Sequence, residues 1–99
     1  MNTEDKRILV ADDDRVVRRI VVTKLSGLGY TVNGVEDGQE ALEALQEAPP
    51  DLLITDQLMP RMHGLQLLRE VRGNPDLTGL PVIMLTARGG ERDVIEGLE

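Results

Sequence analysis

The sequence predicts an α/β domain built on a parallel sheet with helices on both faces. Short apolar runs alternate along the chain with longer segments whose apolar residues recur at helical spacing. Short loops rich in Gly, Pro and Asp join these segments, and strands that alternate with helices favour right-handed crossovers and a parallel sheet. The chain has 99 residues, so we expect one domain over residues 1–99.

Four apolar runs mark the strands. The third is fenced by Pro49-Pro50 before it and Pro60 after it, which is typical of a short buried strand. The fourth, PVIMLT, is apolar almost throughout, and this indicates burial on both faces of the sheet. The predicted strands are residues 8–11, 30–35, 51–56 and 81–86.

Four segments with helical periodicity follow the strands. Asp14 suits the N-cap of the first, and Asp37 opens the second with Glu40 three residues later, in the pattern of a capping box. Gly73-Asn74-Pro75 closes the third. The predicted helices are residues 15–28, 37–48, 65–73 and 91–99. In the first, the residues expected to pack against the sheet are Val17, Ile20, Val21, Leu25 and Leu28.

Composition excludes several classes of function. The net charge is −7, with 18 acidic and 11 basic residues, so a nucleic-acid backbone would be repelled. Arg15, Arg18 and Arg19 form the main basic cluster, which we interpret as a solvated helix face. The chain has no cysteine, no long apolar run and a single aromatic residue, Tyr30. We therefore expect no direct nucleic-acid partner, no membrane span and a cytoplasmic location.

Carboxylates follow two of the predicted strands at the point where each strand ends. Asp12 and Asp13 come directly after the first strand, and Asp56 is the last residue of the third. Because the carboxyl ends of parallel strands meet at one edge of the sheet, these side chains should lie together. Clustered carboxylates need a counter-charge, and oxygen-only ligands favour Mg²⁺, with Mn²⁺ or Ca²⁺ as substitutes.

A carboxylate pocket of this kind suggests phosphoryl transfer, which needs an aligned nucleophile and stabilised phosphoryl oxygens. Asp56 is the candidate nucleophile, and Asp12 and Asp13 are the candidate metal ligands. Thr86 and Ala87 end the fourth strand at the same edge. The Thr86 hydroxyl and the Ala87 backbone N–H are candidates to bond the phosphoryl oxygens.

Three segments resemble the response-regulator receiver domain of two-component signalling: ILVADDD at 8–14, DLLITDQLMPRMHG at 51–64 and PVIMLTA at 81–87. The resemblance implies a flavodoxin-like, doubly wound sheet with strand order 2-1-3-4. It also implies that Asp56 takes a phosphoryl group from a histidine kinase or phosphotransfer protein, and that Thr86 is the switch hydroxyl. Asp13 resembles a direct Mg²⁺ ligand, Asp12 one that acts largely through water, and the Leu58 main-chain carbonyl the third protein ligand.

The sequence given ends at Glu99, whereas the family has a fifth strand, which carries a lysine, and a fifth helix. We therefore expect an incomplete receiver with four of the usual five strands. An alternative is a receiver-like protein-interaction module that does not switch, because that lysine is missing. The open edge of the strand at 81–86 predicts a homodimer or a domain-swapped assembly.

Two enzyme classes are disfavoured. An aspartate-nucleophile phosphatase needs a second acid two residues after the nucleophile, and Leu58 occupies that position. A dinucleotide-binding role would need a G-x-G-x-x-G after the first strand, which the sequence lacks. We therefore expect a signalling receiver that catalyses its own aspartate phosphorylation at most, rather than an enzyme.

Overall fold

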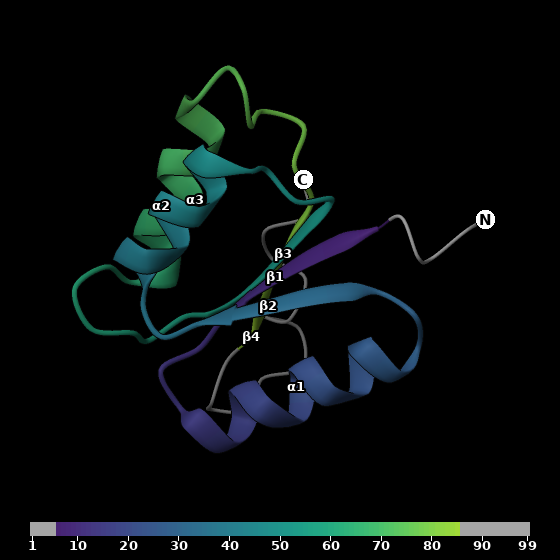
Figure 1. The fold of residues 1–99 in the computed structure, drawn as a ribbon. Coiled ribbons are helices and arrows are strands. Elements are labelled where there is room, and N and C mark those ends of the chain that lie inside the picture. Colours follow the sequence, from purple (N-terminus) through teal and green to yellow (C-terminus); the bar gives the residue numbers. More distant parts are fainter. Residues whose placement is uncertain (1–5, 86–99) are drawn as a thin grey trace.

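The four strands form one parallel sheet in the order β2-β1-β3-β4, in a computed structural model that describes residues 6–85 (Figure 1). This confirms both the predicted α/β class and the predicted strand order. The strands are β1 Arg7–Ala11, β2 Thr31–Val35, β3 Leu52–Asp56 and β4 Val82–Leu85. Each strand begins and ends within one residue of the predicted bounds. Thr86, the last residue of the fourth predicted strand, lies outside the described residues.

The described helices cover both faces of the sheet. In Figure 1, α1 lies on one face, while α2 and α3 lie side by side on the other. The helices are α1 Arg15–Gly27, α2 Gly38–Glu47 and α3 Gly64–Gly73. The helix predicted at 91–99 lies outside the described residues. Within residues 6–85, the helices are too short or too polar to cross a membrane.

The register brings the ends of β1 and β3 to the same level. Ala11, the last residue of β1, pairs with Thr55, so Asp12 and Asp56 leave the sheet side by side. On its other side Ala11 pairs with Val35 of β2. The parallel pairing thus places the acidic residues together through the backbone alone.

The main core lies between the sheet and the pair α2 and α3. Leu9 and Leu53 point to this side from β1 and β3 and meet Ala41, Leu45 and Leu67 of the helices, all of them buried. With a single aromatic residue in the chain, aliphatic and Met side chains fill this core.

The opposite face is more thinly covered. Ile8, Val10 and Ile54 are buried there, and α1 supplies partly buried Val21, Val22 and Leu25. The predicted packing face of α1 is therefore wrong in part. Ile20 and Leu28 are exposed at 51% and 66%, Val17 lies in the exposed class at 37%, and none of the residues of α1 is fully buried. Helical periodicity identifies the apolar positions of α1. The stripe of α1 that contacts the sheet is narrower than the face that these apolar residues cover.

Candidate functional site

Three carboxylates meet at the carboxyl edge of the sheet. One carboxylate oxygen from each of Asp12, Asp13 and Asp56 lies within 4.8 Å of the others. Asp12 and Asp56 are only 3% and 8% exposed, while Asp13 is open to solvent. This is the convergence that the sequence predicts from two strand ends.

Main-chain bonds fix Asp12 in place. Its N–H donates to the Val35 carbonyl at 3.1 Å, which extends the β1–β2 pairing by one bond. Its Oδ1 accepts from the Asp14 N–H at 2.9 Å. Its carbonyl accepts from Nη1 of Arg18 at 2.8 Å, and Arg18 is half-buried. The predicted solvated arginine face is therefore wrong for Arg18, whereas Arg15 and Arg19 are exposed as predicted. Asp14 is the predicted cap of α1, and its Oδ1 accepts from the Val16 and Val17 N–H groups.

Asp56 is held by the loop that follows it. Its Oδ1 accepts from the Gln57 N–H at 2.8 Å. The loop returns at once, because the Gly64 N–H donates to the Gln57 carbonyl at 2.9 Å. Gly64 packs so closely that a Cβ there would clash with the Asp56 carbonyl oxygen. The start of the loop and its end are therefore both anchored at Asp56.

The electrostatics of the cluster are unfavourable for bare carboxylates. Burial raises the pKa of Asp12, and the nearby Asp56 and Asp13 charges add to this against the opposing Asp14 N–H bond. Burial likewise raises the pKa of Asp56, helped by the Asp13 charge and opposed by the Gln57 and Leu58 N–H groups. A divalent cation would relieve both effects, and a donor set of oxygens alone fits Mg²⁺, Mn²⁺ or Ca²⁺ rather than zinc.

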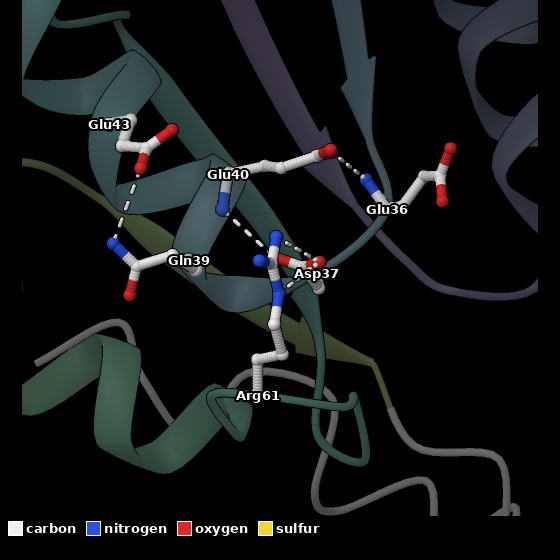
Figure 2. A network of polar contacts seen from close by, with 6 residues as sticks. All are labelled: Glu36, Asp37, Gln39, Glu40, Glu43 and Arg61. Carbon is white, nitrogen blue, oxygen red and sulfur yellow. Dashed lines mark hydrogen bonds and ion pairs between the residues drawn. The ribbon is translucent and has the colours of Figure 1, made fainter.

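A second polar network lies at the start of α2 (Figure 2). Asp37 accepts from the Glu40 N–H at 2.8 Å, which confirms the predicted cap, and its Oδ2 accepts from Nε and Nη2 of Arg61 at 2.9 and 2.8 Å. Glu40 bonds the Glu36 N–H rather than that of Asp37, so the capping box is shifted by one residue. No periodic pattern links positions 37 and 61, so the sequence carries no signal for the role of Arg61.

Of the other predicted site residues, the structure describes Leu58 but not Thr86 or Ala87. Leu58 lies in the loop after Asp56 and is 50% exposed, and the metal-ligand role of its carbonyl stays a prediction. Thr86 and Ala87 lie outside the described residues.

Comparison with known proteins identifies the class. Residues 8–99 match the response regulator receiver domain family. The response regulator MprA of Mycobacterium ulcerans is 45% identical over 94% of this chain, and the match covers 39% of that protein. A transcriptional regulator of Cyanophora paradoxa, ycf27, is 43% identical over the whole chain, which covers 40% of it. The chain thus spans about two fifths of the length of these curated relatives.

A solved structure agrees. A response regulator from Chloroflexus aurantiacus matches 85% of this chain and 69% of its own, with a TM-score of 0.82 and 39% identity. The chain therefore belongs to the response-regulator receiver domain family, whose members interact with histidine kinases or phosphotransfer partners in two-component signalling.

Proposed function

We propose that Asp56 accepts a phosphoryl group from a histidine kinase or phosphotransfer protein, in the presence of Mg²⁺. The observation that carries this proposal is the cluster of Asp12, Asp13 and Asp56, whose carboxylate oxygens lie within 4.8 Å of one another. Membership of the receiver family supports it. So does the likeness to a cyanobacterial phytochrome response regulator, RcpA, whose structure is of the phosphorylated protein (TM-score 0.79, 28% identity, 89% of this chain and 69% of that one).

The chemistry requires one carboxylate oxygen of Asp56 to attack the phosphorus atom. The new O–P bond forms as the P–N bond of the donor phosphohistidine breaks, and the imidazole leaves. The Gln57 N–H already holds Oδ1 of Asp56, which leaves its other oxygen as the nucleophile. Burial raises the pKa of this carboxyl, and a cation beside it would favour the ionised form.

The same cluster would hold Mg²⁺, through Asp12, Asp13 and Asp56 with the Leu58 carbonyl as a further ligand. The cation supplies positive charge against the phosphoryl oxygens and the carboxylates. We assign Thr86 as the switch hydroxyl and the Ala87 N–H as a phosphoryl contact on the resemblance. The chain acts as an acceptor rather than as an enzyme on a separate substrate, and a cytoplasmic location stays a prediction.

Phosphorylation with a small donor tests the proposal. The chain is incubated with acetyl phosphate and Mg²⁺, and intact mass is expected to show one added phosphoryl group. Asp56→Asn should show none. Asp14→Asn is the matched control, since Asn caps a helix as well as Asp, and it should keep the adduct. Absence of an adduct on the unmodified chain would favour the alternative, a receiver-like interaction module that does not accept phosphate.

The β4 edge supports a proposal about assembly. Among the described residues, β4 pairs with β3 alone, and Ile83 and Leu85 are half-buried. We expect a homodimer or an exchange of C-terminal elements that covers this edge. Light scattering across a range of concentrations measures it, and a monomer at high concentration would contradict it.

A further inference from the structure

The loop between β3 and α3, residues 57–63, begins directly after Asp56. Its first residue donates to Asp56, since the Gln57 N–H bonds Oδ1 of that carboxylate at 2.8 Å, and the Leu58 N–H helps to lower the pKa of the same carboxyl. The N–H that holds Asp56 is therefore the first of the loop, and it also donates to the Leu85 carbonyl of β4 at 3.1 Å. Its two ends are closed by the bond between the Gly64 N–H and the Gln57 carbonyl.

The tip of the loop is held in a conformation that its sequence does not favour. Arg61 has φ of 68°, and among the described residues it alone has positive φ without being glycine. The Met62 N–H closes a tight turn around it by donating to the Pro60 carbonyl at 2.7 Å. A side chain in the left-handed region persists only where its surroundings hold it there.

The side chain of Arg61 contacts the start of α2. Figure 2 shows it reaching from the loop to the start of α2, where Nε and Nη2 both donate to Oδ2 of Asp37. Asp37 is itself fixed, because its other oxygen accepts from the Glu40 N–H. The Asp37 side chain is 10% exposed and that of Arg61 59%, so the acceptor end of the contact is buried.

Backbone packing meets the ion pair at the same place. Gly38, the first residue of α2, lies so close to the loop that a Cβ there would clash with the Met62 carbonyl oxygen. Met62 is 8% exposed and belongs to the main core. The loop therefore contacts the start of α2 at two adjacent residues, Arg61 and Met62.

We infer that Arg61 is a positioning residue: its ion pair with Asp37 fixes the loop whose N–H groups orient Asp56 for cation binding and phosphorylation. The inference rests on the function proposed above. If Arg61 is removed, a purely structural ion pair and a positioning ion pair lead to opposite changes in Mg²⁺ affinity. Removing a positive charge near an acidic cluster strengthens cation binding by Coulomb attraction alone. Loss of positioning weakens it.

The test uses Arg61→Gly in the whole chain. Glycine adopts positive φ freely, so this variant removes the side-chain contact while easing the backbone. We expect Mg²⁺ to bind about tenfold more weakly, the loss typical of groups that orient metal ligands. Binding is measured by calorimetry and by an NMR titration that follows the Gln57 amide. Unfolding by urea, without Mg²⁺, is expected to stay close to that of the unmodified chain.

Two further variants and one control sharpen the result. Asp37→Asn keeps a capping side chain but loses the charge, so it should weaken Mg²⁺ binding in the same direction. The double variant should bind no more weakly than the weaker single one, because both changes break one contact. Arg19→Gln removes one exposed positive charge from α1 and should leave Mg²⁺ affinity unchanged or slightly higher.

Amide hydrogen exchange of Gln57 and Leu58 without Mg²⁺ gives a readout independent of the metal, and exchange should be faster in Arg61→Gly. Unchanged or tighter Mg²⁺ binding by Arg61→Gly, with unchanged exchange, would overturn the inference. Failure of the proposed function looks different, because the unmodified chain would then show neither Mg²⁺ binding nor a phosphoryl adduct.

Discussion

Buried carboxylates lie in two different environments at the same edge of the sheet. Asp12 and Asp56 belong to the acidic cluster, and Asp37 lies at the start of α2. Asp12, Asp56 and Asp37 are exposed to similar extents, at 3%, 8% and 7%. Burial raises the pKa of Asp12 and of Asp56, whose neighbours are other acids. The pKa of Asp37 is lowered, first by the Glu40 N–H and then by Arg61.

Burial alone does not decide what a carboxylate does. Asp37 has its donors within the chain, so it stabilises the fold as it stands. Asp12 and Asp56 lie among other acids, and a bound cation would relieve the repulsion between them. A group that the chain leaves without a counter-charge, at the edge of a sheet where ligands bind, is a candidate functional group.

The largest expected effect comes from the packing that supports the acidic cluster. Gly64→Ala places a Cβ against the Asp56 carbonyl oxygen and near Sδ of Met84. We expect it to lower the free energy of unfolding by about 2–3 kcal/mol, as overpacking does. Urea denaturation measures this loss.

Gly73→Ala is the matched control, because a Cβ at Gly73 meets nothing within 4 Å. It should change stability by less than about 0.5 kcal/mol. Equal losses for the two variants would show that the close approach at Gly64 is not what matters.

Mg²⁺ should stabilise the folded chain through the acidic cluster. At a concentration tenfold above its dissociation constant, a ligand that binds only the folded state adds about 1.4 kcal/mol. Thermal unfolding with and without Mg²⁺ measures the gain. Asp13→Asn should lose most of it, whereas Asp14→Asn should keep it, and equal gains in both would contradict the assignment of ligands.

Removing the charge of Asp56 and removing that of Asp37 should change stability in opposite directions when Mg²⁺ is absent. Asp56→Asn relieves a buried, uncompensated charge and should raise the free energy of unfolding by about 1 kcal/mol. Asp37→Asn keeps the cap but loses the ion pair, so it should lower stability by a smaller amount, since Arg61 is largely solvated. Urea denaturation of both variants measures this. Changes of the same sign in the free energy of unfolding would show that the two carboxylates do not differ in this way.

The pH dependence should be the smallest of these effects. The pKa of Asp56 is raised from its ordinary value of 3.8, so the folded chain binds this proton more tightly than the unfolded chain does. Its contribution is therefore present at low pH and is lost as pH rises through the raised pKa. Asp37, with its lowered pKa, behaves in the opposite way, since its contribution is lost as pH falls below 3.8.

The difference in unfolding free energy between the unmodified chain and Asp56→Asn isolates this group from the other acids. Without Mg²⁺, that difference should grow as pH rises from acidic to neutral. With Mg²⁺ the gain from binding should also grow with pH, because the cation binds the ionised carboxylates. A difference that does not vary with pH would mean that the Asp56 carboxyl titrates normally.

Much of this fold and site could be predicted from local patterns. Alternation of apolar runs with helical periodicity was enough to predict the sheet, and the sheet brings Asp12, Asp13 and Asp56 together because parallel strands end at one edge. The caps Asp14 and Asp37 could be recognised because a cap is a contact within one turn of helix.

The rest depends on contacts that no local pattern encodes. The bond from Arg61 to Asp37 joins residues 24 apart in sequence, and it depends on a left-handed backbone at a residue that rarely adopts one. The exposure of Ile20 on α1 depends on how much of the sheet one helix can cover, whereas periodicity reports only which residues are apolar.

The central position of β1 has a consequence for how the chain folds. β1 and β2 pair across the crossover that contains α1. β3 must pass β1 to reach its other side, where the contacts join residues as distant as Arg7 and Asp51, 44 apart in sequence. Such long-range closure is the slow step in assembling parallel sheets. Since β1 supplies Asp12 and β3 supplies Asp56, a cation that requires both reports on this step, and its binding can serve as a kinetic probe of when the sheet closes.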